Sequence, residues 1–324
     1  MNEKIDDYAA LFTGNVPMMD VRAPVEFAKG AFPCAENLPL LNDEERHQIG
    51  ICYARQGQDA AIELGHQLVG GSTREQRMAA WQHWCEAHPE GVIYCFRGGL
   101  RSQTVQSWLA AEGTHRPLVA GGYKAMRRFL LEYFEREIHQ QPLIILAGRT
   151  GTGKTRVIEA LNCCIDLEGI AHHRGSAFGR RPGGQPSQID FENRLSIELL
   201  RYRKRDQSTL VLEDESRLIG RCHLPIVLQE RMSQSARVMI EEDLDSRVQV
   251  TLEDYVCQPL QEYQHLFGAD HAFGKLADSL LHSLDRIRRR LGGARHQQLR
   301  QVRSDALDQH GRTGDTEAHR AWIS

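Results

Sequence analysis

Short apolar runs alternate with helical periodicities along the first 140 residues. Apolar runs at 16–21, 91–94 and 117–119 have the length of buried strands. Apolar positions recur at helical spacing in four stretches between and after them, at residues 60–69, 74–88, 102–111 and 123–139. Because strands that alternate with helices pair in parallel, this pattern predicts an α/β fold with a parallel sheet covered by helices.

The pattern restarts after Gln140, Gln141 and Pro142, which predicts a boundary between two domains, residues 1–140 and 141–324. An apolar strand at 143–147 opens a second α/β unit, and a second buried strand is expected at 209–212. Residues 174–187 are too rich in Gly, Arg, Pro and Ser for a helix and predict a loop. Beyond Val238 the chain is expected to be mostly helical, with a long periodicity over 273–291 that ends at two glycines.

Composition agrees with a soluble protein of two domains. The chain has 324 residues, of which 41% are hydrophobic and 26% charged. It contains no apolar run of the roughly 18–20 residues that a membrane helix requires, and its polar, acidic start is no secretory signal. Eight cysteines without regular spacing indicate reduced thiols and neither a disulfide framework nor a zinc site. We therefore expect a cytoplasmic protein without a bound metal or a tightly bound cofactor.

Basic side chains gather at two places although the net charge is only -3. Seven arginines and no acidic residue lie between 286 and 303, including Arg288, Arg289 and Arg290. The other cluster consists of Arg201, Arg203, Lys204 and Arg205. Such patches suit a polyanionic partner such as nucleic acid, and a solvated helix face is an equal alternative for either one.

A cysteine at the end of a predicted strand is the first candidate for chemistry. Cys95 is followed by Arg97, by two glycines and by residues that begin a helix: Gly98, Gly99, Arg101 and Ser102. Backbone N–H groups of such a loop converge on one point, where the helix N-terminus adds partial positive charge. The pattern favours a nucleophilic thiolate in an anion-binding loop over a buried structural cysteine.

A phosphate-binding loop is the second candidate. Residues 148–155 match G-x-x-x-x-G-K-[ST] between an apolar strand and a helical pattern, with Gly148, Gly151, Gly153, Lys154 and Thr155. Lys154 would reach the terminal phosphates, and the Thr155 hydroxyl would bind Mg²⁺ if ATP is the ligand.

An acidic triplet follows the predicted strand at 209–212 and consists of Glu213, Asp214 and Glu215. A carboxylate that orients water or faces a metal would lie at this strand end, with Asp214 and Glu213 as the candidates. An ordinary acidic turn is the alternative.

The N-terminal half resembles the rhodanese (sulfurtransferase) domain in three separated segments. They are residues 20–27 (DVRAPVEF) with 30–39, the Cys95 loop, and residues 119–124 (VAGGYK). The resemblance implies that Cys95 carries transferred sulfur or selenium.

The order of the motifs along the whole chain resembles one family, the tRNA 2-selenouridine synthases. The segments that carry this likeness are residues 94–102, 146–155, 173–179 (HRGSAFG) and 213–220 (EDESRLIG). The resemblance implies that selenium replaces sulfur at the 2-position of the wobble uridine in certain tRNAs. Selenophosphate would be the selenium donor. A separate enzyme that synthesises selenophosphate would have to supply it. The reaction would pass through an S-geranylated 2-thiouridine made from geranyl diphosphate.

The same resemblance distributes roles over the candidate residues. Cys95 would accept or present selenium while Arg97, Arg101 and the loop amides hold the phosphate-bearing donor. The P-loop would hold the diphosphate of the geranyl donor, and ATP is the other candidate ligand. The basic clusters would contact the tRNA backbone.

Two other functions compete with this one. Residues 95–102 also fit Cys-x5-Arg-Ser, the loop of cysteine-dependent phosphatases, although Tyr94 stands where many of them have a histidine. The second alternative is a P-loop protein that binds tRNA and whose rhodanese half is a non-catalytic docking module. The presence of Cys95 with its arginines argues against that module.

Overall fold

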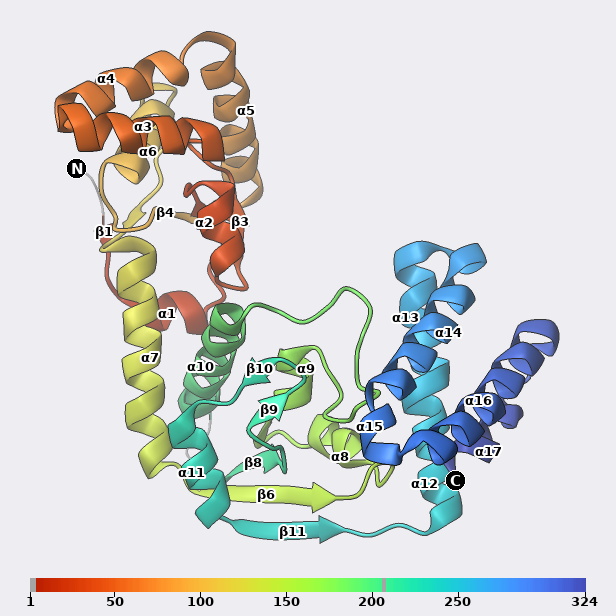
Figure 1. Cartoon of the computed structure of the whole chain (residues 1–324). Coiled ribbons are helices and arrows are strands. Elements are labelled where there is room, and N and C mark those ends of the chain that lie inside the picture. Colours follow the sequence, from red (N-terminus) through yellow and green to blue (C-terminus); the bar gives the residue numbers. More distant parts are fainter. Residues whose placement is uncertain (1–3, 206–207) are drawn as a thin grey trace. The chain divides into compact units, whose positions relative to one another are not determined.

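The computed structural model describes residues 4–205 and 208–324, and contacts within the chain divide them into two compact units (Figure 1). The first unit contains residues up to Glu137 together with Glu192–Arg205. The second contains Ile138–Phe191 and the rest of the chain. The division after Glu137 lies three residues before the boundary expected from the sequence, which had also placed residues 192–205 in the second domain.

The first unit is built on a five-stranded sheet of parallel strands in the order β1-β5-β4-β2-β3. The strands are short: β1 (Lys4–Ile5), β2 (Met18–Asp20), β3 (Ala35–Asn37), β4 (Val92–Tyr94) and β5 (Leu118–Val119). The parallel α/β fold predicted from the alternating pattern is thus confirmed. Strands β1 and β3 were not predicted, because Lys4–Ile5 and Ala35–Asn37 contain no apolar run.

Seven helices of this unit follow the chain between and after these strands: α1 (Tyr8–Thr13), α2 (Pro24–Lys29), α3 (Asp43–Gln56), α4 (Gln58–Leu68), α5 (Gly71–Ala87), α6 (Leu100–Ala111) and α7 (Gly122–Gln140). The predicted helices match α4 to α7 within three residues at each end. Helix α3 was missed because it has no buried residue and so no apolar stripe. Its start is nevertheless marked in the sequence by a capping box between Asn42 and Glu45.

Helix α10 (Gln188–Arg205) supplies the segment that joins the first unit from later in the chain. Arg127 forms an ion pair with Glu192 at 2.5 Å, and the Asn193 amide donates a hydrogen bond to the Ala31 carbonyl at 2.9 Å. Near the end of the helix, Arg201 donates to the Phe12 carbonyl at 3.1 Å. These polar contacts hold α10 to α1, α7 and the loop before β3.

The second unit has a four-stranded parallel sheet in the order β11-β6-β8-β7. Its strands are β6 (Leu143–Gly148), β7 (Cys164–Ile165), β8 (Leu210–Glu213) and β11 (Ala236–Ile240), and β9 (Leu218–Ile219) pairs with β10 (Cys222–His223) in a separate antiparallel ribbon. Figure 1 shows β6 and β11 side by side. Strand β11 falls at the beginning of the part predicted to be mostly helical. It was missed because Val238 and Met239 are half exposed on an edge strand and lack a buried pattern.

The remaining helices of this unit are α8 (Lys154–Ala160), α9 (Leu167–Ala171), α11 (Ile226–Gln234), α12 (Leu244–Leu252), the π-helical turn η1 (Glu253–Cys257), α13 (Gln258–Phe267), α14 (Ala269–Arg286), α15 (Arg288–Leu291), α16 (Gly293–Thr313), the 3-10 turn η2 (Glu317–His319) and α17 (Arg320–Ile323). The long periodicity over 273–291 is therefore two helices, which meet at Ile287. A separate core of Tyr263, Leu276, Leu280 and Leu307 holds α13, α14 and α16 together. None of the helices in residues 4–205 and 208–324 is long and apolar enough to cross a membrane.

Candidate functional site

The Cys95 loop occupies the carboxyl end of the central strand of the first unit. Strand β4 ends at Tyr94 and α6 begins at Leu100, so residues 95–99 form the connection. The Cys95 side chain is 3% exposed, and its Sγ lies 3.2 Å from the Ser102 hydroxyl and 3.8 Å from the Gly99 carbonyl oxygen. All eight cysteines are free. Cys95 is thus a buried thiol at a helix N-terminus with a hydroxyl at hydrogen-bond distance.

A turn of two glycines supports the loop from behind. The N–H of Tyr123 donates to the Cys95 carbonyl at 2.9 Å, and that of Lys124 donates to the Phe96 carbonyl at 3.0 Å. A Cβ at Gly122 would stand 2.2 Å from the Cys95 oxygen, and φ of Gly122 is +58°. Only glycine fits this close approach of two backbones. The segments 94–102 and 119–124, which are separated in sequence, are therefore one structural unit.

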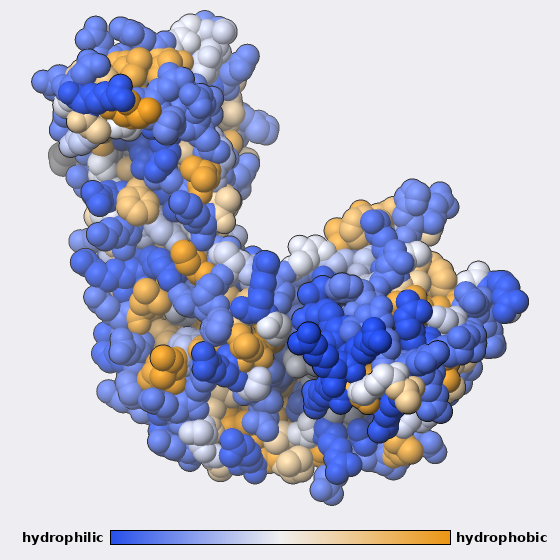
Figure 2. All heavy atoms as spheres, in the orientation of Figure 1, coloured by the Kyte–Doolittle hydropathy of each residue, from blue (hydrophilic) through white to orange (hydrophobic). Residues whose placement is uncertain are grey.

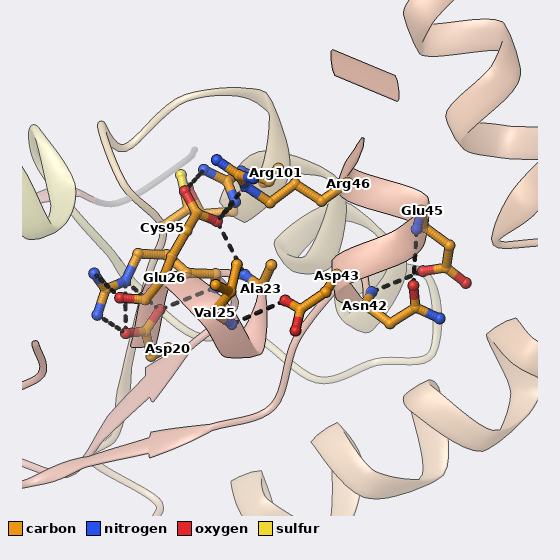
Figure 3. A network of polar contacts seen from close by, with 12 residues as sticks. Asp20, Ala23, Val25, Glu26, Asn42, Asp43, Glu45, Arg46, Cys95 and Arg101 are labelled. Carbon is orange, nitrogen blue, oxygen red and sulfur yellow. Dashed lines mark hydrogen bonds and ion pairs between the residues drawn. The ribbon is translucent and has the colours of Figure 1, made fainter. Parts of the chain in front are cut away.

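Arg101 is paired with a carboxylate that the sequence had not assigned a role. It contacts Glu26 at 2.5 Å, and Arg46 lies 3.3 Å from the same carboxylate (Figure 3). Burial by itself would raise the pKa of Glu26, but the hydrogen bond and charge of Arg101 lower it below its usual range. Arg97 is exposed beside the loop. Of the two arginines expected to hold an anion, Arg97 is thus unburied and Arg101 already has a carboxylate partner.

An apolar cavity of about 320 Å³ lies next to the Cys95 loop. Leu100 and Arg101, the first residues of α6, form part of its wall. The other walls come mainly from α3, α4 and α6 and include Ile49, Ala61, Thr104 and Trp108. The sequence did not predict this cavity because it depends on how α3 and α4 pack.

The P-loop of the second unit connects β6 with α8. Gly151 and Gly153 have φ of +82° and +78°, the left-handed region that glycine tolerates and that the loop requires. Lys154 Nζ donates to the Gly148 carbonyl at 2.7 Å. A cavity of about 270 Å³ lies over the loop. It is lined by residues 150–155 together with three acidic residues, Glu168, Asp214 and Glu215.

The three residues of the acidic triplet have different surroundings. Glu213 is fully buried at the end of β8, directly beside β6, and one of its oxygens accepts from the Glu168 N–H at 3.2 Å. Its other carboxyl oxygen has no hydrogen-bond partner within the described residues. Burial, together with the charges of Glu168 and Asp166, raises the pKa of Glu213 to about 8. Asp214 is 43% exposed and lies 3.7 Å from Arg237.

Glu215 lines the cavity and is also held in its protonated form near neutral pH. Burial, then the charge of Glu168 and a hydrogen bond with it, raise the pKa of Glu215 to about 9. The sequence did not single out Glu215 or Glu168, since two interacting carboxyl groups are recognised only from their spatial proximity.

The two basic clusters differ in whether their side chains form ion pairs and hydrogen bonds within the protein. Arg201 contacts Glu198 at 2.8 Å, Arg203 contacts Glu137 at 3.1 Å and Lys204 donates to Thr13 at 2.9 Å, all within the first unit. By contrast, Arg288, Arg289 and Arg290 on α15 are exposed, and none of them forms an ion pair with another described residue. Figure 2 shows hydrophilic side chains gathered where Figure 1 places α15. Arg288 and Arg300 also line one open depression of about 530 Å³.

These features define an α/β protein with a buried-thiol loop in one unit and a phosphate-binding loop in the other. A family model described as "tRNA 2-selenouridine synthase AAA domain" matches residues 141–324. Curated relatives named tRNA 2-selenouridine synthase extend the likeness to the whole chain. The protein of Alcanivorax borkumensis is 61% identical over 100% of this chain and 89% of its own length, and that of Marinobacter nauticus is 54% identical over 98% and 87%. A Pseudomonas syringae relative is 51% identical over 100% and 88%. The chain belongs to the tRNA 2-selenouridine synthase family.

Proposed function

We propose that this protein replaces sulfur by selenium at the 2-position of the wobble uridine in tRNA, with selenophosphate as the selenium donor. Membership of the family supports the reaction, and the Cys95 loop is the observation that carries it. A thiol that is 97% buried, with a hydroxyl at 3.2 Å and a locked backbone, can present selenium out of contact with water. The alternative functions, a phosphatase and a non-catalytic rhodanese module, have no such support from the comparisons.

The donor's phosphate group would be bound by the loop rather than by both arginines. The amides of Gly98 and Gly99, the N-terminus of α6 and the exposed Arg97 provide an anion site next to Cys95. Arg101 stays with Glu26 and fixes the first turn of α6. A cytoplasmic enzyme that makes selenophosphate would supply this site.

We further propose that the reaction uses an S-geranyl-2-thiouridine intermediate whose geranyl group occupies the apolar cavity beside Cys95. The cavity volume of about 320 Å³ falls within the roughly 300–1,000 Å³ of small-molecule sites. Each buried methylene would contribute about 0.8 kcal/mol to binding. The selenium of selenophosphate attacks C2 of the base, the C2–S bond breaks, and geranylthiolate leaves and takes up a proton. Water then cleaves the Se–P bond, which leaves selenium on C2 and releases phosphate. Because Leu100 and Arg101 belong both to the cavity wall and to α6, the leaving group would lie close to the Cys95 loop.

Filling this cavity should weaken binding of the geranylated substrate. We expect Thr104→Phe to raise the KM for S-geranyl-2-thiouridine RNA about tenfold, since the phenyl ring would occupy the volume that the geranyl group needs. The measurement is selenation of that RNA followed by nucleoside mass spectrometry. Gln103→Phe, one residue earlier on α6 and outside the cavity lining, is the matched control and should keep its KM. Equal KM values for the two variants would place the geranyl group elsewhere.

The P-loop is proposed to hold the diphosphate of geranyl diphosphate in the step that makes the intermediate. Sulfur of the 2-thiouridine attacks C1 of the geranyl group, the C–O bond breaks, and the diphosphate leaves. Lys154 and the loop amides would stabilise the charge that develops on it. ATP with Mg²⁺ is the other ligand such a loop takes, and the Thr155 hydroxyl would then contact the metal. Within residues 4–205 and 208–324 no three acidic, His or Cys side chains are grouped to hold a metal ion.

The exposed arginines of α15 are proposed to contact the tRNA backbone. Replacing Arg288, Arg289 and Arg290 together with glutamine should weaken tRNA binding and reduce the slope of log K against log salt by about two to three, since each lost phosphate contact removes close to 0.9. The measurement is a salt titration of tRNA affinity. Arg128→Gln with Arg136→Gln, two exposed arginines of α7 that form ion pairs, serves as the control. An unaltered slope in the triple variant would leave α15 as a solvated surface.

A further inference from the structure

Residues 174–181 form a strap beside the P-loop. Neither the P-loop motif nor the proposed reaction assigns a role to these residues. Three of them, Arg174, Gly175 and Ser176, line the P-loop cavity together with residues 150–155. A Cβ at Gly175 would stand 2.4 Å from one Glu215 oxygen and 2.7 Å from a Glu168 oxygen. The strap therefore passes so close to the acidic side of the cavity that a Cβ at Gly175 would require the Glu215 and Glu168 side chains to move.

Lys154 and Arg174 are the only cationic side chains among the described residues that line this cavity. Four carboxyl groups also line it: those of Glu168, Asp214, Glu215 and Asp254. Because carboxyl groups outnumber cations in this lining, an anionic ligand would have to bind next to Lys154 and Arg174. Lys154 comes from the P-loop itself and Arg174 from the strap, so the two cations belong to different walls.

Arg174 is only 12% exposed, and its one ion pair among the described residues is long. Its guanidinium donates to the neutral Gln258 amide oxygen at 2.9 Å. This ion pair is with Glu262 at 3.8 Å, and Arg181 contacts the same carboxylate at 2.7 Å. Burial, and then the charge of Arg181, lower the pKa of Arg174. A largely buried cation that shares a distant carboxylate with a second arginine is incompletely neutralised, and a bound phosphate would supply the missing charge.

The strap is held in place by contacts that do not involve the cavity. The Arg174 N–H donates to the Gly179 carbonyl at 2.8 Å, which closes the strap on itself. Phe178 packs under the guanidinium of Arg303, 4.4 Å from the ring centre, and the same guanidinium lies 3.8 Å from the Trp322 ring centre. The C-terminal helices α16 and α17 thus anchor the strap, and Arg174 is positioned before any ligand binds.

We propose that Arg174 is a second phosphate-binding side chain of the P-loop site, which contacts the ligand's phosphate from the strap while Lys154 does so from the P-loop. The inference rests on the proposed function in one respect, that the P-loop binds a diphosphate group. It gives the strap a role, because the backbone hydrogen bond from Arg174 to Gly179 and the packing of Phe178 fix the segment that carries Arg174. The site then binds a diphosphate between a lysine and an arginine supplied by two segments of the second unit.

Calorimetric titration of the full-length protein with inorganic pyrophosphate tests this assignment. Arg174→Gln should weaken binding about tenfold or more, as expected when a charge-assisted hydrogen bond is lost. Arg174→Lys, which keeps the charge, should bind with an intermediate affinity and thereby show that a folding defect is not the cause. Arg181→Gln is the matched control, because Arg181 shares Glu262 but does not line the P-loop cavity, and its affinity should stay within about twofold of the parent.

Three results would overturn the inference. They differ in whether the proposed diphosphate role of the P-loop also fails. If Arg174→Gln binds pyrophosphate like the parent while Lys154→Ala does not, Arg174 is not a ligand contact but the P-loop assignment stands. An equal loss in Arg181→Gln would mean that the strap's ion pairs and not Arg174 itself matter. Absence of pyrophosphate binding by the parent protein would overturn the diphosphate role of the P-loop together with this inference.

Discussion

Cys95→Ser should abolish the formation of 2-selenouridine while tRNA binding and the fold are retained. Serine replaces the Sγ, which is 3% exposed, by a slightly smaller oxygen, so packing around the loop changes little. A hydroxyl cannot take over the carriage of selenium, and the expected loss is complete within detection. The measurement is mass spectrometry of anticodon nucleosides after incubation of 2-thiouridine tRNA with geranyl diphosphate and selenophosphate.

The first unit offers a matched control for this variant. Cys85 is also buried, at 1% exposure, and belongs to the same hydrophobic core, but it lies on α5 and not in the loop. Cys85→Ser should therefore keep the selenium transfer. Undiminished 2-selenouridine in Cys95→Ser would remove Cys95 from the mechanism. Release of phosphate from a phosphopeptide by the unsubstituted protein would instead support the phosphatase function.

Lys154→Ala should lower the formation of S-geranyl-2-thiouridine by about a hundredfold or more. The lysine ammonium is the point charge of the P-loop, and removal of one group that stabilises developing charge commonly costs 10² to 10³ in rate. The assay measures geranylated nucleoside from 2-thiouridine tRNA and geranyl diphosphate in the absence of selenium donor.

The second half of the reaction supplies the internal control for Lys154→Ala. RNA that already carries the geranyl group bypasses the diphosphate step, so the variant should convert it to 2-selenouridine at the parent rate. Arg149→Ala, at an exposed position of the same loop, should affect neither step strongly. Normal geranylation by Lys154→Ala would assign the P-loop to another ligand, of which ATP is the first to test.

The sequence predicted those parts of the fold that carry a clear period or a short motif. Helices α4 to α7 and strands β4, β6 and β8 each present an apolar pattern long enough to read, and both loops are defined by glycines at fixed spacing. Helix α3 has no buried residue and therefore no apolar stripe to read. Helix α10 was not predicted although it buries Phe191, Leu195, Leu199 and Tyr202, because charged residues are interspersed among these positions.

The parts of the site that were not predicted depend on contacts between distant segments. Glu26 belongs to the first segment of the rhodanese likeness, but its pairing with Arg101 bridges 75 positions and has no local signal. The acidic triplet was recognised as a candidate, whereas the burial of Glu213 and the proximity of Glu215 to Glu168 follow only from the packing of β8 beside β6 and α9. The apolar cavity likewise exists only once α3 and α4 have folded.

Helix α10 has a consequence for how the protein can be divided. The first unit takes residues 192–205 from a part of the chain that lies beyond the P-loop, and Arg127, Ala31 and Phe12 have hydrogen-bonding partners there. A gene fragment that stops at the apparent boundary near residue 140 would therefore encode a first unit without one of its helices. In genetic terms the two units are not successive cassettes, since part of the second unit's sequence is an insertion within the first.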